Sequence, residues 1–240
     1  KLATDSIPEN KNGQWNGDNT GPNGWSMSAS GLAAIWATEN TREAILEALE
    51  RREVYATTGP RIGVQFYAGD FRDEDLSSAD LHSMATGRGV PMGGELVGPQ
   101  APNFLVVAHR DPLGANLDRI QIVKGWLDSE GKALEKVFNV AWSGDRAPDA
   151  NGKLPAVGNT VDLDTGEVEN SIGAPQLSAV WQDPEFNAND NAFYYVRVLQ
   201  IPTARHSLLD ARALGLEHAG DHPDTIQERA YTSAIWYKPK

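Results

Sequence analysis

The sequence contains no cysteine among its 240 residues. Disulfide bonds, thiolate nucleophiles and cysteine-ligated metal sites are therefore excluded. Long apolar runs are missing as well, and none approaches the length of about 20 residues that a membrane-spanning helix needs. Basic residues are few, with 21 Lys and Arg against 33 Asp and Glu, which gives a formal net charge of -12. Because nucleic acids and anionic membrane surfaces attract basic patches, we expect neither as the main partner.

Recognisable catalytic motifs are also missing. The chain has no Gly-x-Ser-x-Gly nucleophile elbow, no P-loop and no glycine-rich dinucleotide loop after a strand. Its five histidines include no His-x-His pair and no His-Glu-x-x-His motif. His218 and His222 lie four residues apart, but Gly220 and Pro223 disfavour the helix that would align them. A solvated loop is the preferred interpretation there, and we predict no metal ligand in this chain.

The first 30 residues are rich in Asn, Gly, Ser and Pro and show no periodicity, which indicates a loop or linker. The chain begins at Lys1, and no apolar signal-like segment follows. We therefore expect a processed form, a proteolytic fragment or a cloned domain. Exported and cytosolic proteins both accommodate a cysteine-free sequence, so the compartment stays open.

Residues 40–62 predict a helix, a short strand and a Gly-Pro turn in direct succession. Asn40 is a suitable N-cap for the helix. Ile45, Ala48 and Leu49 recur at helical spacing, so one face of this helix is apolar. Residues of high β propensity then follow, and the Gly-Pro pair ends them.

Most of the remaining chain predicts strands, because short apolar or alternating segments are separated by turn residues. These segments are 61–68, 104–108, 117–126, 137–142, 177–181, 192–201 and 228–237. The segments 117–126 and 137–142 predict a hairpin, and 104–108 a central strand. Residues 81–98, with five glycines and a proline, predict one short edge strand that the proline restricts. Residues 203–224 predict a long loop with one helical turn. The pattern is typical of a mainly β protein with a minor α part, an antiparallel β-sandwich.

One cluster of charged residues is the candidate site. His109, Arg110 and Asp111 follow the predicted central strand, where side chains can line a cleft, and Arg suits phosphate or carboxylate. Arg61 follows the Gly-Pro turn and is the second candidate for contact with an anion. The structural interpretation, in which Arg110 and Asp111 stabilise the loop, is the preferred one of the two. Similarly, seven tryptophans suggest a sugar platform, but most lie in predicted strands, which favours core packing.

Several long phrases resemble a bacterial family of unknown function, the one numbered 3604. They include Gly31-Leu-Ala-Ala-Ile-Trp-Ala-Thr-Glu-Asn-Thr-Arg-Glu-Ala-Ile45, Arg52-Glu-Val-Tyr-Ala-Thr-Thr-Gly-Pro-Arg-Ile62, Val90-Pro-Met-Gly-Gly94 and Leu117-Asp-Arg-Ile-Gln-Ile-Val-Lys-Gly-Trp126. Ala192-Phe-Tyr-Tyr-Val-Arg-Val-Leu-Gln-Ile-Pro-Thr203 and Glu228-Arg-Ala-Tyr-Thr-Ser-Ala-Ile-Trp-Tyr237 fit too. The resemblance runs from about Gly24 to the C-terminus.

The resemblance implies a relationship to PHP-type (polymerase and histidinol phosphatase) metal-dependent phosphoesterases. In such proteins a metal-binding half, expected to hold Zn or Mn, lies upstream of the region matched here, and its His-x-His and Asp-x-His motifs do not occur in this chain. The implied organisation is a linker at 1–30, a helix-strand remnant of the PHP-like barrel at 31–60, and a C-terminal β-sandwich at 61–240. The missing PHP-like half would be the main partner.

Three functions follow as expectations. The favoured one is a β-rich accessory part of a PHP-like metal-dependent hydrolase, not catalytic by itself, with Arg61 or Arg110 at the rim of a site whose metals are bound elsewhere. The second is a carbohydrate- or ligand-binding β-sandwich, and the third is a structural domain that forms a homo-oligomer.

Overall fold

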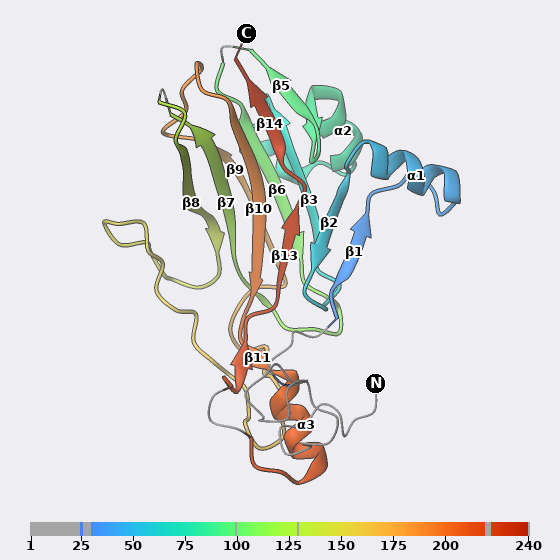
Figure 1. Cartoon of the computed structure of the whole chain (residues 1–240), viewed down its shortest axis with the longest axis vertical. Coiled ribbons are helices and arrows are strands. Elements are labelled where there is room, and N and C mark those ends of the chain that lie inside the picture. Colours follow the sequence, from blue (N-terminus) through green and yellow to red (C-terminus); the bar gives the residue numbers. More distant parts are fainter. Residues whose placement is uncertain (1–24, 26–29, 99, 129, 219–221, 240) are drawn as a thin grey trace.

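The computed structural model describes residues 25, 30–98, 100–128, 130–218 and 222–239, so the predicted linker lies almost wholly outside the described residues. The described chain is mainly β, with two sheets packed face to face and three helices at their margins (Figure 1). None of the helices in this part of the chain has the length and apolar character needed to cross a membrane.

The larger sheet has eight strands in the order β1-β2-β13-β10-β7-β8, with β14 beside the first half of β10 and β5 beside β14. All neighbours are antiparallel except β14 and β5. The strands are β1 (Leu32–Ile35), β2 (Val54–Thr57), β5 (Glu95–Val97), β7 (Leu117–Leu127), β8 (Ala133–Trp142), β10 (Ala192–Gln200), β13 (Arg229–Thr232) and β14 (Ile235–Lys238).

The smaller sheet is fully antiparallel, with the order β4-β3-β6-β9. Its strands are β3 (Gly63–Gly69), β4 (Gly89–Pro91), β6 (Asn103–His109) and β9 (Gln176–Gln182). A separate two-stranded ribbon joins β11 (Thr203–Ala204) to β12 (Thr225–Ile226) at one end of the molecule. This ribbon carries the helix α3 (His206–Leu214) away from the sandwich (Figure 1).

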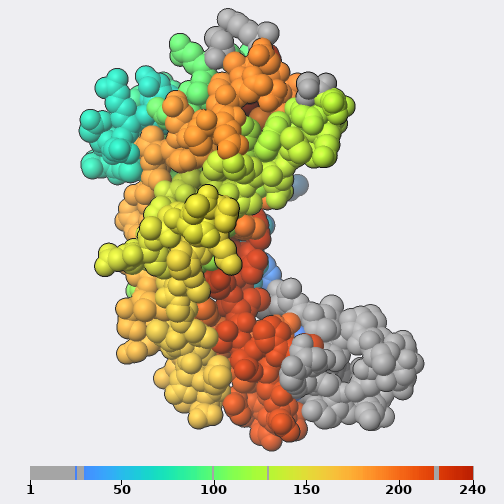
Figure 2. Space-filling view, turned by 90° about the vertical axis from the view of Figure 1, so that its left-hand side faces the viewer, coloured from blue at the N-terminus to red at the C-terminus, as the bar shows by residue number. Residues whose placement is uncertain are grey.

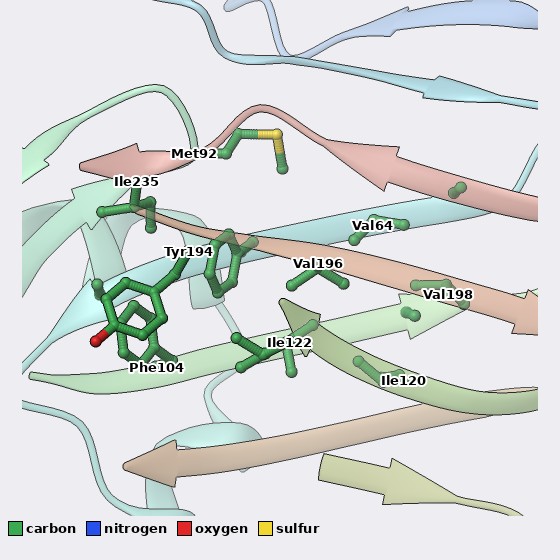
Figure 3. Close-up of a cluster of buried hydrophobic side chains, with 14 of the residues drawn as sticks. Val64, Met92, Phe104, Ile120, Ile122, Tyr194, Val196, Val198 and Ile235 are labelled. Atoms are coloured by element: carbon green, nitrogen blue, oxygen red, sulfur yellow. The ribbon is translucent and has the colours of Figure 1, made fainter. Parts of the chain in front are cut away.

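The core lies between the two sheets because each strand buries every second side chain. Val64 and Phe104 face it from the smaller sheet, and Ile122, Tyr194 and Val196 face it from the larger sheet (Figure 3). Aromatic rings form its centre. The Phe104 ring lies 4.5 Å from that of Tyr194, measured between ring centroids.

The outer faces of the two sheets are covered differently. The 3₁₀ turn η2 (Asp73–Ser77) and the helix α2 (Leu81–Arg88) pack on the outer face of the smaller sheet. Tyr67, Leu105 and Val107 form a second core cluster beneath them, so β6 is buried on both faces. In the described part of the chain no helix covers the outer face of the larger sheet (Figure 1).

The sequence-based prediction of a mainly β protein is confirmed, and so are the 117–142 hairpin and the central strand at 104–108. Other expectations were wrong. Residues 81–98 form helix α2 and the two short strands β4 and β5 rather than one edge strand alone. The helix α1 (Arg42–Glu50) is capped by Thr41, whose Oγ1 accepts a hydrogen bond from the Ala44 N–H at 3.3 Å, and not by Asn40.

We expect Phe104→Ala to destabilise the chain by about 3–5 kcal/mol, because the substitution opens a cavity that the surrounding side chains cannot fill completely. Phe104 is fully buried between Phe66, Tyr194 and Trp181. Urea unfolding would measure the change. Leu113→Ala, at a side chain that is 97% exposed, is the control, with an expected effect within about 0.5 kcal/mol. A loss below about 1 kcal/mol for Phe104→Ala would contradict this packing.

Candidate functional site

The strand-end cluster is brought together by the pairing of β3 with β6, which places Gly63 opposite His109. The residues just outside this pair, Arg61 and Asp111, then meet. The backbone N–H of Arg61 donates to Asp111 Oδ2 at 2.8 Å, and the N–H of Leu113 donates to Oδ1 at 3.0 Å. These two backbone donors hold the pKa of Asp111 below its ordinary value. The carboxylate therefore fixes the turn.

Arg110 also serves this turn. Its Nη1 donates to the carbonyl of Gly114 at 2.9 Å, and its backbone N–H donates to the carbonyl of Pro175 at 2.9 Å. His109 is exposed at the end of β6. The geometry thus gives Arg110 and Asp111 structural partners. Contact of Arg61 or Arg110 with an anion stays a prediction.

A row of aromatic rings crosses the outer face of the larger sheet. Phe193 and Tyr195 point outward from β10, because their neighbours along the strand point into the core. The Trp236 ring lies 5.2 Å from that of Phe193, Phe193 lies 6.4 Å from Tyr195, and Tyr195 lies 6.4 Å from Tyr231. We call these four residues the aromatic row. The sequence had suggested core packing for the tryptophans, yet Trp236 is 42% exposed.

A line of polar side chains continues from the aromatic row along the same face. Arg197 Nε donates to Gln121 Oε1 at 2.8 Å, and Gln121 Nε2 donates to Asn139 Oδ1 at 2.9 Å. Asn139 Nδ2 in turn donates to the carbonyl of Gly152 at 2.9 Å. We call Arg197, Gln121 and Asn139 the polar ladder. Each member is held in one orientation by the next.

A buried ion pair lies at the opposite side of β7 and β10, inside the sandwich. Lys124 Nζ donates to Asp183 Oδ2 at 2.6 Å and to the carbonyl of Glu185 at 2.8 Å. The Tyr194 hydroxyl donates to the same Asp183 oxygen at 2.8 Å. Burial, followed by the hydrogen bond to Asp183, raises the pKa of Tyr194 far above its ordinary value. Lys124, Asp183 and Tyr194 are buried and hydrogen-bonded to one another through the Asp183 carboxylate, and they connect β7, β10 and the loop after β9.

A second buried carboxylate, that of Asp118, is fully enclosed on β7. Arg146 Nη2 donates to its Oδ1 at 2.7 Å and Gln227 Nε2 to its Oδ2 at 2.9 Å. The nearest atom of the Arg119 guanidinium lies 3.1 Å from Oδ2. These contacts tie the loop after β8 and the segment between β12 and β13 to the sheet.

Sequence reasoning did not find the hydrogen-bonded series of Ser207, His218 and Asp224. A serine, a histidine and an aspartate are linked by hydrogen bonds in the same order in a hydrolase triad. His218 Nε2 lies 2.9 Å from Ser207 Oγ, and Nδ1 lies 2.8 Å from Asp224 Oδ1. Ser207 is fully buried, however, and its Oγ also accepts a hydrogen bond from Arg205 Nη1 at 2.6 Å. A hydroxyl enclosed in this way cannot reach a substrate. These hydrogen bonds instead connect the start of α3 to the segment before β12.

No group of three or more potential ligands among the described residues is placed to hold a metal ion. Both ring nitrogens of His218 already face Ser207 and Asp224. The described residues therefore do not fit a catalytic metal, and no step of a reaction is assigned to one here.

Comparison with known sequences gives the same family as the resemblance of the phrases quoted above. The chain belongs to the family described as "Protein of unknown function (DUF3604)". The match covers residues 1–239, so it begins before Gly24, the residue from which the resemblance was expected to run.

Two curated relatives are themselves uncharacterized proteins. One, from Chlamydia pneumoniae, is 30% identical over 174 residues, which cover 72% of this chain and 21% of the relative. The other, from Chlamydia muridarum (strain MoPn / Nigg), is 28% identical over 170 residues, which cover 71% of this chain and 20% of the relative. The chain thus spans about a fifth of the length of the relatives it matches. No solved structure matches it.

We predict that Asp183→Asn costs about 3–5 kcal/mol, because it leaves the buried ammonium of Lys124 without a counter-charge. Urea unfolding would measure the loss. The double variant Lys124→Met/Asp183→Asn removes both charges and is expected to recover part of the stability. Equal losses in the single and double variants would contradict the pairing.

Asp111→Asn is expected to lower stability at neutral pH by an amount that shrinks in acid. The folded-state pKa of Asp111 lies below the ordinary value of about 3.9, so its contribution is present above that value and is lost as the pH falls through the folded pKa. Urea unfolding of both proteins between about pH 2 and 7 would measure the difference. Asp145→Asn, at an exposed carboxylate, is the control. A difference that is independent of pH would contradict the proposed role of the carboxylate.

Proposed function

We propose that this chain is a β-rich accessory part of a larger protein and is not catalytic by itself. Its α1 and β1 side would pack against another part of that protein. The observation that carries the proposal is the exposure of large apolar side chains there. Leu46 and Leu49 on α1 are 54% and 47% exposed, although Ala44 and Ala48 on the other side of the helix are buried.

The helix α1 projects from the edge of the larger sheet, with β1 beneath it (Figure 1). The apolar residues Ile45, Ala48 and Leu49 were expected to share one face, and of the three only Ala48 is fully buried within the described chain. Exposed leucines on a short helix lose the burial energy that stabilises most helices in proteins. A partner that covers them would restore it.

The strand β1 supports the same proposal. Among the described strands it pairs only with β2, so its other edge has no partner there. Its sequence, Leu-Ala-Ala-Ile, contains none of the lysines or prolines that usually protect an edge. Such an edge suits the addition of a strand from another part of the protein.

The larger protein would be a PHP-like metal-dependent hydrolase of the phosphoesterase type. Support comes from the resemblance of the long phrases and from relatives about five times the length of the matched region. Zn or Mn would be held in the other part. Residues 31–60 would then be the last helix and strand of that part, joined to the sandwich of residues 61–240 because β2 pairs with β13 in the larger sheet.

We expect Leu46→Glu/Leu49→Glu to have little effect on the isolated chain, within about 0.5 kcal/mol, because both side chains are exposed. In a longer protein of the family that contains this chain, the same change should lower the melting temperature, because two charges would enter an apolar contact. Differential scanning calorimetry on both proteins would measure this. Leu113→Glu, at an exposed apolar residue of the β6–β7 turn, is the control.

Two outcomes would contradict the proposal. The first is an equally small effect in both proteins. The second is concentration-dependent dimerisation of the isolated chain that the double variant abolishes, which would make a second copy the partner. Turnover of a generic phosphate ester by the isolated chain with Mn²⁺ or Zn²⁺ would separately contradict its being non-catalytic.

A further inference from the structure

The outer face of the larger sheet is hollowed. Figure 2 views the molecule from the β8 edge, and the β7–β8 turn projects at the upper right of its outline. A cavity of about 540 Å³ lies at the β7–β8 end, where Phe193, Trp236, Leu134 and Glu135 line it. A second cavity, of about 320 Å³, lies toward α3 and is lined by Tyr231 among others. The aromatic row connects the two.

We propose that this hollow binds a neutral oligosaccharide, with sugar rings stacked along the aromatic row and their hydroxyl groups bonded to the polar ladder. The first argument is shape. The four rings follow one another at 5.2, 6.4 and 6.4 Å, so they make an elongated platform rather than a closed box. A chain of sugar units fits such a platform, whereas a compact cation would use only part of it.

The second argument is the mixture of chemical groups. The negative face of an aromatic ring attracts the positively polarised C–H groups on one face of a sugar. Beside the rings, Arg197 uses only Nε within the ladder, and its two terminal nitrogens make no hydrogen bond to other described residues. These N–H donors, together with Glu135 at the rim, suit hydroxyl groups at the edge of a sugar. A purely apolar ligand would leave them without partners.

The third argument is charge. The lining of the two cavities and the polar ladder carry the carboxylates of Glu135 and Glu228 and the guanidinium groups of Arg197, Arg205 and Arg229, and Lys238 at the rim is already paired with Glu95 at 2.9 Å. No sign of charge dominates. Because the whole chain carries a formal charge of -12, long-range repulsion also disfavours a polyanion. A neutral chain is the ligand that this balance favours.

The fourth argument is that the platform is preformed. Gly125 lies opposite Phe193 on the neighbouring strand, and a Cβ added at Gly125 would come within 2.2 Å of Phe193 Cζ. The ring therefore lies directly on the backbone, where only glycine leaves room for it. A fixed ring loses little entropy on binding, which favours affinity.

The test is titration of the whole chain with neutral hexaoses of glucose, mannose, xylose and N-acetylglucosamine, followed by tryptophan fluorescence and calorimetry. We expect at least one hexaose to bind, and its monosaccharide to bind at least tenfold more weakly, since a single unit covers one ring of the row. Trp236→Ala and Tyr195→Ala should each weaken the hexaose at least tenfold. Gly125→Ala should also weaken it, because it displaces the Phe193 ring.

Leu113→Ala, at an exposed side chain that lines neither cavity, is the control and should bind normally, and circular dichroism should confirm that every variant is folded. Three results would overturn the proposal: no binding by any of the four hexaoses, stronger binding of tetramethylammonium or of a hexa-uronate than of every neutral hexaose, or binding that Trp236→Ala and Tyr195→Ala leave unchanged. None of these results bears on the α1 side, so the proposed accessory role is tested separately.

Discussion

The alternation of side chains along β10 is the constraint on which the rest of the molecule depends. Tyr194, Val196 and Val198 complete the core, and between them Phe193 and Tyr195 form the outer platform. Because side chains alternate with a period of two, a shift of the register by one residue would move the rings inward and the core residues outward. Packing energy thus fixes the outer face indirectly. The rings stay outward because the core holds the register, even though exposing them is itself unfavourable.

The buried pair of Lys124 and Asp183 adds a second, directional constraint on the same two strands. Apolar packing alone would tolerate a shift of the strand register by two residues, because each side chain would stay on its face. An ammonium group that must meet one carboxylate and one carbonyl does not tolerate such a shift. The hydroxyl of Tyr194, on β10, bonds to the same carboxylate as Lys124, on β7. The pairing of β7 with β10 is therefore set by polar geometry inside the sandwich, and Gly125 and Phe193 meet on the outer side as a consequence.

Local patterns in the sequence were sufficient for most strands, because alternation and turn residues reflect the same two-faced burial that the structure shows. These patterns failed where two adjacent residues are equally suited to the same structural role. Asn40 and Thr41 both cap helices well, and only the tertiary position of α1 selects Thr41. The glycines around α2 concealed a helix whose burial comes from the smaller sheet. For the site, the approach of Arg61 to Asp111 needed the register of β3 and β6. The aromatic row needed three strands, β10, β13 and β14, and two of them lie more than 25 residues beyond β10 in sequence, so no local spacing could indicate it.

The two uncovered surfaces differ in chemistry, and the difference bears on their partners. The α1 side offers aliphatic side chains and an unprotected strand edge, features that a protein partner covers by burial and backbone pairing. The hollow offers aromatic rings followed along the same face by amide and guanidinium groups, and a dry protein contact would leave the terminal nitrogens of Arg197 without an acceptor among the described residues. Water or a hydroxylated ligand in the hollow would supply that acceptor. Permanent cover is therefore expected on the α1 side, and exchangeable occupancy in the hollow.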